Sequence, residues 1–169
     1  RPDRLGKWAS RVPRLANSFI QSGLGRAMGK SLLGLTPNRP VPRYADSTFE
    51  DWFCDHDIDD QGPRGTVAIW DDCFVRYNEP QVGAAAVRVL QAAGYGIDFA
   101  YGATCCGRPA FSLGRFDVAA EFARENVRRM GQSDLPIIFL EPSCYSMFKE
   151  DYAELGVEGA QQLAERAVL

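Results

Sequence analysis

The sequence has little of what many enzymes depend on. His56 is the single histidine among 169 residues, so a catalytic site built on histidine is poorly supplied. No apolar run approaches the roughly 20 residues that a membrane-spanning helix needs, and no signal peptide is recognisable. The chain begins with Arg1 rather than with methionine, so we expect it to be a piece of a longer protein.

Cysteine is scarce, and its spacing does not resemble a disulfide framework. The five cysteines are an odd number, which favours reduced thiols in a cytoplasmic protein over a secreted, cross-linked one. No Cys-x-x-Cys motif occurs. Its absence disfavours both a thiol–disulfide redox enzyme and a zinc ribbon or finger.

Composition and charge then suggest how the chain is divided. With 46% hydrophobic and 24% charged residues, it is an ordinary globular sequence. Residues 1–43 carry nine Lys or Arg and one Asp, a balance of +8, whereas the remainder carries a balance of −11. This break predicts a basic helical arm with a Pro-rich linker over 1–43, a short helix and acidic loop over 44–64, and an α/β domain over 65–169.

The basic arm has apolar residues at helical spacing. Pro13 would break a helix there unless the helix begins at that point. A basic arm of this kind suits a membrane surface, a nucleic acid or a neighbouring domain. We favour contact with a neighbouring domain and expect no binding of nucleic acid. We expect at most a peripheral membrane association, because several glycines weaken an autonomous membrane helix. The apolar stripes are Trp8, Val12, Leu15, Phe19 and Ile20, followed by Leu24, Met28 and Leu32.

The segment over 44–64 has one helix signal and one misleading acidic run. Ser47–Glu50 has the pattern of a capping box and predicts a short helix that carries Phe49, Trp52 and Phe53 inward. The four aspartates over 55–60 do not fit a calcium loop, because Gly and Glu are missing at its sixth and twelfth positions. We interpret the run as a solvated loop, and Cys54 and His56 beside it as structural.

From Gly65 onward, apolar β-rich runs alternate with helical patterns. Alternation of this kind predicts an α/β fold with a small parallel sheet of βαβαβ type and right-handed crossovers. The expected strands cover 66–70, 95–100 and 136–140. The expected helices run from Pro80 to a stop at Gly94, over 117–130, from about Tyr145, and over 161–169.

Each expected strand is followed by cysteine: Cys73 after the first, Cys105 and Cys106 after the second, and Cys144 after the third. Ligands of parallel sheets bind beyond the carboxyl ends of the strands, so these thiols are expected to converge. The adjacent pair sits about 3.8 Å apart between alpha carbons, which is too close for a mutual disulfide. Four thiols in one crevice favour a thiophilic metal, either zinc or an iron–sulfur cluster.

The arrangement Cys73 … Cys105-Cys106-Gly107 … Ser143-Cys144 resembles the cysteine-rich CCG domain family, which occurs in the B subunit of heterodisulfide reductase, glycolate oxidase iron–sulfur subunits and lactate-utilisation iron–sulfur proteins. The resemblance covers about residues 65–155. It implies that the cysteines at 73, 105, 106 and 144 are metal ligands of a [4Fe–4S] cluster, and that Gly107, Arg108 and Pro109 adjoin the cofactor. The chain departs from the family at Met147, where heterodisulfide reductase closes a Cys-x-x-Cys motif.

The resemblance also implies a setting for the chain. It predicts an electron-transfer module of an FAD-linked oxidoreductase that acts on a 2-hydroxy acid such as glycolate or lactate, or on a related substrate. The expected partners are flavin-binding and ferredoxin-like domains or subunits and a second CCG domain, with FAD bound outside this chain. We assign no catalytic residue here and expect this part alone not to be catalytic. The alternative is a degenerate CCG domain with a structural or docking role that holds zinc or no metal.

Overall fold

In the computed structural model, which describes residues 2–34, 36, 40–100 and 102–169, four parallel strands form one sheet in the order β2-β1-β3-β4. The strands are β1 (Thr66–Ile69), β2 (Gly96–Phe99), β3 (Ile137–Ile138) and β4 (Ala167–Val168). The order reverses between β1 and β3, because β2 lies on one side of β1 and β3 on the other. Open parallel sheets bind ligands at such a switch point, beyond the carboxyl ends of the strands.

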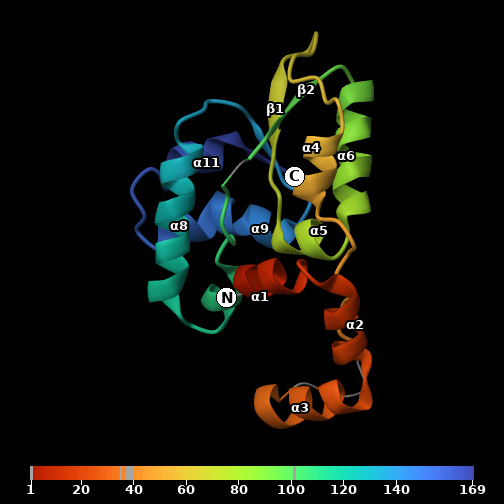
Figure 1. Ribbon diagram of the computed structural model, residues 1–169. Helices are drawn as coiled ribbons and strands as arrows, with labels where there is room; N and C mark the ends of the chain where they lie inside the picture. Colours follow the sequence, from red (N-terminus) through yellow and green to blue (C-terminus); the bar gives the residue numbers. More distant parts are fainter. Residues whose placement is uncertain (1, 35, 37–39, 101) are drawn as a thin grey trace.

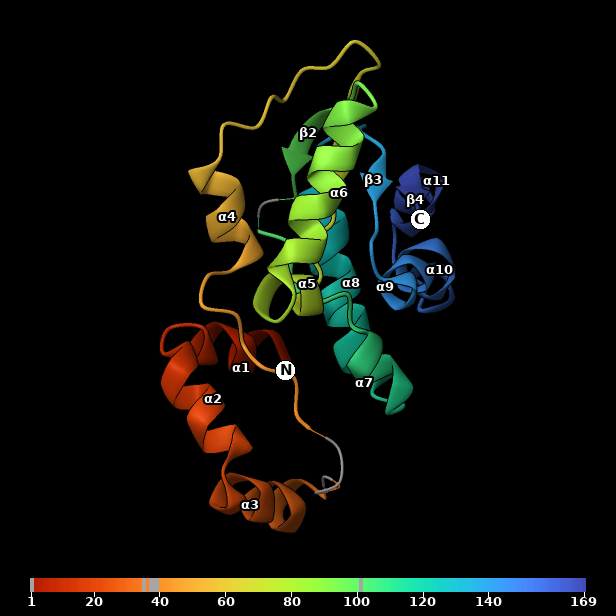
Figure 2. The same ribbon diagram turned by 90° about the vertical axis from the view of Figure 1, so that its right-hand side faces the viewer.

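The sheet is covered on both faces, so the predicted α/β class is confirmed (Figures 1 and 2). On one face, helices α4 (Phe49–Asp55), α5 (Cys73–Tyr77) and α6 (Pro80–Ala92) enclose a core that includes Phe49, Ile69 and Val87. The other face carries α8 (Phe116–Met130), α9 (Pro142–Ser146), a π-helical turn η1 (Met147–Asp151), α10 (Tyr152–Glu154) and α11 (Ala160–Arg166). In β3, for example, Ile137 belongs to the second core and Ile138 packs against the first, as the period of a strand requires.

The second core is the more aromatic of the two. Trp70, Phe139 and Phe148 pack ring against ring, with centroids 4.7–5.6 Å apart, and Tyr152 stacks on Phe148 at 4.6 Å. Each of these four side chains is at most 2% exposed. The cysteines at 106 and 144 belong to the same core, so the candidate site is built into its edge.

Local signals explain where most helices begin and end. Pro13 lies in the first turn of α2 (Pro13–Gln21), where a missing N–H costs nothing, so the chain starts a new helix there. Pro80 begins α6 in the same way, and Gly94 ends it in a left-handed conformation at φ +89°. The predicted boundaries at Pro80 and Gly94 are confirmed, and of the two outcomes left open for Pro13 the structure has the helix start.

The arm consists of α1 (Pro2–Ala9), α2 and α3 (Gly23–Leu33), which form a hook below the sheet in Figure 1. Gly6 of α1 rests against the ring of Tyr77, where a larger residue would collide with it. Asn17 exchanges two hydrogen bonds of 2.8 Å with the backbone of Tyr44, which ties α2 to the linker. Residues 37–39 of the Pro-rich linker lie outside the described residues.

Three local expectations were wrong in detail. The capping box uses Thr48 and Asp51 instead of Ser47 and Glu50, because Thr48 accepts from the backbone N–H of Asp51, whose carboxylate accepts the Thr48 N–H in return. The helix expected from about Tyr145 begins three residues earlier, where the Glu141 side chain accepts from Ser143 N–H and Pro142 fills the first turn.

The third error concerns the end of the chain, where a helix was expected over 161–169. Helix α11 ends at Arg166, whose guanidinium donates to the carbonyls of Leu135 and Met130. The next two residues then pair with Ile137 and Ile138 as strand β4.

In the described part of the chain, no helix is both long and apolar enough to cross a membrane.

Candidate metal centre

The predicted cysteines all lie at the carboxyl edge of the sheet. Cys73 is the first residue of α5, which follows β1, and Cys144 lies in the first turn of α9, after β3. The pair Cys105–Cys106 lies between β2 and α7 (Arg108–Ser112). The loops after β1 and β3 flank the switch point of the sheet, and β2, which precedes the vicinal pair, lies on the other side of β1 from β3.

The four thiols form a continuous row. Cys144 donates to the sulfur of Cys106 over 3.0 Å, Cys106 hydrogen-bonds Cys105, and Cys73 hydrogen-bonds Cys105 from the other side. Outside the pair, Cys105 thus bonds Cys73, and Cys106 bonds Cys144. Cys105, Cys106 and Cys144 are buried, and Cys73 is half-buried.

Cys54 and His56 do not join this row. Cys54 is exposed at the end of α4, and the His56 ring stacks on Trp52 with its Nδ1 2.7 Å from the Trp52 carbonyl oxygen. The aspartates over 55–60 are exposed. The Asp59 side chain accepts from Gln61 N–H, and its backbone carbonyl accepts from Ile97 N–H of β2.

The thiols touch in successive pairs and do not surround one point. Among the described residues, no group of three or more His, Cys, Asp or Glu side chains could hold a metal ion as it stands. Sulfurs around a tetrahedral zinc lie roughly 3.8 Å apart, given a Zn–S bond of about 2.3 Å. The 3.0 Å contact between Cys106 and Cys144 is shorter, so ligation requires these side chains to turn apart.

Hydrogen bonding along the row divides the thiols by acidity. Bonds from Cys106 and Cys73 lower the pKa of Cys105, because they favour its thiolate. The same interactions, together with burial, raise the pKa of Cys73 and of Cys106. Hydrogen bonding within the row therefore favours the thiolate of Cys105 over that of either neighbour.

The first strand ends in two buried acids beside Cys73. Asp72 caps α5 by accepting from the N–H groups of Phe74 and Val75, and burial raises its pKa. Asp71 forms a buried ion pair with Arg76, yet burial outweighs the attraction and raises the Asp71 pKa to about 7. Within the described residues, one carboxylate oxygen of each acid is buried without a hydrogen-bond partner.

The residues after the vicinal pair turn the chain and tie it to the third loop. Gly107 adopts φ +91°, a left-handed conformation that favours glycine, and Pro109 lies in the first turn of α7. A β-carbon at Gly107 would lie 3.4 Å from the nearest atom, so the required conformation rather than the available space selects glycine. Arg108 donates to the Ser143 carbonyl, the Ser146 hydroxyl and the Asp151 carboxylate, which links the vicinal pair to the Cys144 helix.

Met147 stands where the family resembled has the last cysteine of a Cys-x-x-Cys motif. It lies at the start of η1 and is fully buried in the aromatic core. Its packing there accounts for an apolar side chain at this position. The π-helical turn that follows adds a residue to the helix before Tyr152, and such turns are frequent at functional sites.

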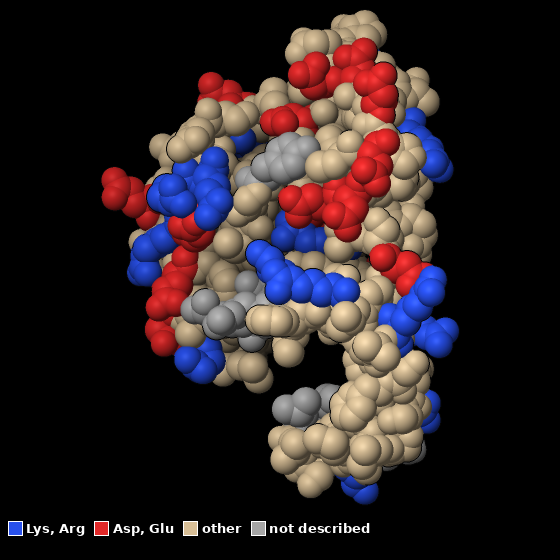
Figure 3. All heavy atoms as spheres, viewed as in Figure 1, with Lys and Arg blue, Asp and Glu red and all other residues tan. Residues whose placement is uncertain are grey.

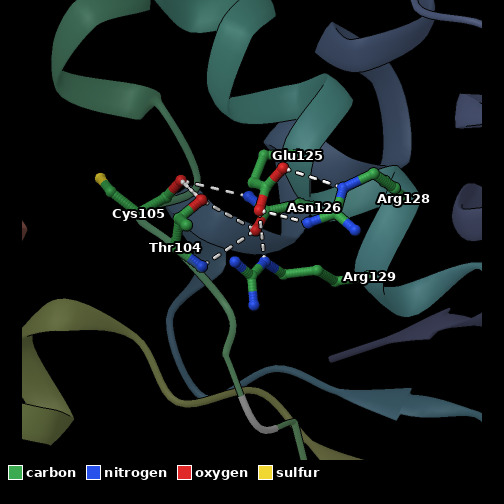
Figure 4. Close-up of polar contacts among 6 residues, drawn as sticks. All are labelled: Thr104, Cys105, Glu125, Asn126, Arg128 and Arg129. Atoms are coloured by element: carbon green, nitrogen blue, oxygen red, sulfur yellow. Dashed lines mark hydrogen bonds and ion pairs between the residues drawn. The ribbon is translucent and has the colours of Figure 1, made fainter.

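The sequence reasoning missed two residues that bond the backbone of the vicinal pair: Asn126, which Figure 4 shows, and Tyr152. Asn126 Oδ1 accepts from the N–H and hydroxyl of Thr104, and its amide group donates to the carbonyl of Cys105 and to the hydroxyl of Tyr152. Tyr152 in turn donates to the carbonyl of Cys106 over 2.9 Å. A signal for Asn126 was present, because it is a polar residue on the otherwise apolar face of α8.

The comparisons with known proteins cover the segment that carries these cysteines. A family model described as a cysteine-rich domain, CCG, matches residues 67–149, a range that contains all four cysteines of the row and excludes Cys54. No solved structure matches the chain.

Several curated proteins are similar in sequence. The C subunit of anaerobic glycerol-3-phosphate dehydrogenase from Escherichia coli K12 is 27% identical over 157 residues, covering 90% of this chain and 40% of the relative. The B subunit of fumarate reductase (CoM/CoB) from Methanothermobacter marburgensis is 34% identical over 98 residues, which is 58% of this chain and 20% of that protein. Lactate utilization protein A of Macrococcus caseolyticus is 31% identical over 83 residues, or 49% of this chain and 34% of the relative. The chain thus spans 40% or less of these three relatives, and its residues 67–149 match the family model of the cysteine-rich CCG domain.

Proposed function

We propose that this chain is an electron-transfer module that holds an iron–sulfur cluster through Cys73, Cys105, Cys106 and Cys144. The observation that carries the proposal is the continuous row of four cysteine sulfurs at the switch point of the sheet. Sulfur donors without nitrogen or oxygen suit an iron–sulfur cluster, and four thiolates are the number that a [4Fe–4S] cluster requires. One of the chain's relatives is itself named an iron–sulfur protein.

The bound cluster would supply the capacity to accept and release one electron. The chain's own residues hold it: the four thiolates are its ligands, and burial of Cys105, Cys106 and Cys144 keeps water away from them. Gly107 turns the backbone directly after the pair, and Pro109 stiffens the turn. Arg108 keeps the second and third loops together through its bonds to the Cys144 helix, and its positive charge favours an anionic cluster nearby.

We propose further that the module belongs to an FAD-linked oxidoreductase in the cytoplasm that acts on a 2-hydroxy acid or a related polyol. The names of the relatives, which include a glycerol-3-phosphate dehydrogenase subunit and lactate utilization proteins, support this substrate class. The flavin would lie in another domain or subunit, and a ferredoxin-like region and a second CCG domain would be further partners. The exposed apolar face of the arm offers such partners a contact surface.

A second function is favoured by one observation. Met147, at the position of a closing cysteine in the family motif, is buried in the core, and the thiols as arranged surround no common point. A domain that holds zinc, or no metal, and serves only for docking would have the same features.

Anaerobic purification with iron, sulfide and zinc analysis separates the two functions. We expect roughly four iron and four sulfide per chain, with loss of most of this iron in Ser variants of each of the four cysteines. The matched control is Cys54→Ser, which changes the one exposed cysteine and is expected to retain all the iron. Stoichiometric zinc without sulfide, or iron content that depends equally on Cys54, would contradict the cluster.

A further inference from the structure

Two buried polar side chains, distant in sequence from the cysteines, hold the backbone of the vicinal pair. Asn126 comes from the middle of α8 and Tyr152 from the start of α10, and both are completely buried. Neither belongs to the motif of cysteines, glycine and proline that marks the family. Their only described polar contacts are with each other and with residues 104–106.

The hydrogen bonds among these groups fix the orientation of each one. The oxygen of Asn126 must face Thr104, because the Thr104 N–H, 3.1 Å away, needs an acceptor. The amide NH₂ group then faces the Cys105 carbonyl at 3.2 Å and the Tyr152 oxygen at 3.0 Å. Since Tyr152 accepts from Asn126, its own proton is directed to the Cys106 carbonyl at 2.9 Å.

This network acts on the two peptide groups that set the direction of the cysteine side chains. The carbonyls of Cys105 and Cys106 are both drawn toward the same side, which the left-handed turn at Gly107 allows. Figure 4 shows the sulfur of Cys105 pointing away from Asn126 while its carbonyl oxygen points toward it. With the carbonyls of Cys105 and Cys106 fixed by these hydrogen bonds, the Cys105 side chain contacts Cys73 and the Cys106 side chain contacts Cys144.

We propose that Asn126 and Tyr152 are positioning residues for the vicinal cysteines, which keep the sulfur of Cys105 directed toward Cys73 and the sulfur of Cys106 directed toward Cys144. They touch neither sulfur and act through the backbone. For the loaded protein the proposal rests on the function above, since it predicts tighter retention of a cluster. For the metal-free protein it stands on the described contacts alone.

The deciding variant is Tyr152→Phe, which removes one hydroxyl and keeps the ring in its aromatic stack. Tyr145→Phe is the matched control, because Tyr145 lies in α9 against Phe139 and no hydrogen bond of its hydroxyl is among the described contacts. Thr104→Val is a second variant, which removes the hydroxyl that donates to Asn126 at a half-buried position and leaves the two clamping residues in place.

The first measurement uses metal-free, reduced protein and does not depend on any cluster. Iodoacetamide alkylation of each cysteine is followed by peptide mass spectrometry, with far-UV circular dichroism to confirm folding. In Tyr152→Phe we expect Cys105 and Cys106 to react about tenfold faster than in the wild type, the factor that corresponds to the loss of one hydrogen bond. Cys73 and Cys54 should keep their rates, Thr104→Val should give a smaller increase, and Tyr145→Phe should give none.

The second measurement uses anaerobically reconstituted protein. We expect Tyr152→Phe to release iron to a chelator about tenfold faster than Tyr145→Phe and to shift the reduction potential, because the ligand geometry is less fixed. A purely structural role would accelerate all four thiols alike and leave the potential unchanged, and that result would overturn the proposal. Equal alkylation rates in Tyr152→Phe and Tyr145→Phe would also overturn it. Failure of the wild type to take up iron would count against the cluster, while the alkylation rates would still decide the positioning role.

Discussion

The arm and the α/β body have similar helical patterns of apolar residues but opposite surroundings. In the body, Phe49, Ile69 and Trp70 are at most 1% exposed. In the arm, Trp8, Leu15 and Leu32 are 67–73% exposed, and helix α2 has no buried residue. Periodicity therefore predicts that a helix forms and which face is apolar, but it does not predict what covers that face.

The two regions also differ in charge, as Figure 3 shows for one side of the molecule. Acidic side chains (red) gather on the body around α4 and the loop above it, whereas α3 at the bottom carries none. The sequence of α3 contains Arg26 and Lys30 and no acid. An apolar surface with basic residues and no acidic ones is suited to a partner with the opposite charge. The arm thus has the exposed apolar and basic surface that the proposed contact with another domain requires, while most of the large apolar side chains of the body pack into its own cores.

The largest expected effect compares one tryptophan from each region. Trp70→Ala should lower the free energy of unfolding by about 3–5 kcal/mol, because it leaves a cavity among Phe139, Phe148 and the buried end of β1. Trp8→Ala should change it by less than about 0.5 kcal/mol, since its side chain is mostly in solvent. Urea unfolding of both variants measures the difference. Similar losses in the two would show that the arm is packed as firmly as the body.

A slightly smaller effect should follow oxidation of the metal-free protein. Hydrogen peroxide can oxidise the Cys106 and Cys144 thiols to one disulfide and is itself reduced to two water molecules. Their sulfurs lie 3.0 Å apart, so closure to the bond length of about 2.05 Å needs only a small shift. Cross-linking of this loop should stabilise the fold by about 2–4 kcal/mol.

Peptide mass spectrometry should find Cys106 joined to Cys144 as the main product. The variant Cys54→Ser should give the same product, because Cys54 is exposed and outside the row. A main product that contains Cys54, or destabilisation on oxidation, would contradict the described geometry of the row.

The buried ion pair of Asp71 and Arg76 contrasts with the exposed pair of Asp46 and Arg14, which joins the arm to the body. Burial raises the pKa of Asp71 from 3.8 to about 7, so the folded state keeps a proton that the unfolded state has already lost. The stability contributed by Asp71 is therefore full below about pH 3.8 and is lost as the pH rises to about 7. For one carboxyl, the slope is at most about 1.4 kcal/mol per pH unit.

Unfolding by urea at several pH values between about 4 and 8 tests this dependence. Asp71→Asn should flatten the decline between about pH 4 and 7, although it also weakens the contact with Arg76. Asp46→Asn, at a side chain that is 74% exposed, should leave the profile unchanged. An increase of wild-type stability over the same window would mean that the attraction of Arg76 outweighs burial.

Much of the body was predictable because its signals are local and its topology is constrained. Apolar runs identified β1, β2 and β3, and Gly94 and Pro80 identified the ends of α6. Parallel strands then place all their carboxyl ends at one edge, which brought together the cysteines at 73, 105, 106 and 144 without knowledge of any distance. That part of the site followed from connectivity alone.

The rest depends on contacts between distant residues. The bonds of Asn126 and Tyr152 to the vicinal pair span 21 to 46 positions in sequence, and no local pattern encodes them. Strand β4 has only two residues and depends on pairing with β3, so its helical periodicity was misleading. The short helix α5 was missed because the side chain of Asp72 caps it immediately after the strand, where a loop was expected.

The smallest expected effect on stability concerns the apolar stripe of the arm. A double change, Leu15→Ser with Phe19→Ser, should alter the free energy of unfolding of this chain by less than about 0.5 kcal/mol, because both side chains are largely exposed. The same change should weaken association with a partner domain by at least about tenfold if the stripe is its contact surface, since exposed apolar patches of this kind mark interfaces. Calorimetry or analytical ultracentrifugation with the partner measures this, and Ser18→Ala on the same helix is the control. A large loss of stability without loss of association would mean that the arm belongs to the body's own core, and the contrast between the two regions would fail.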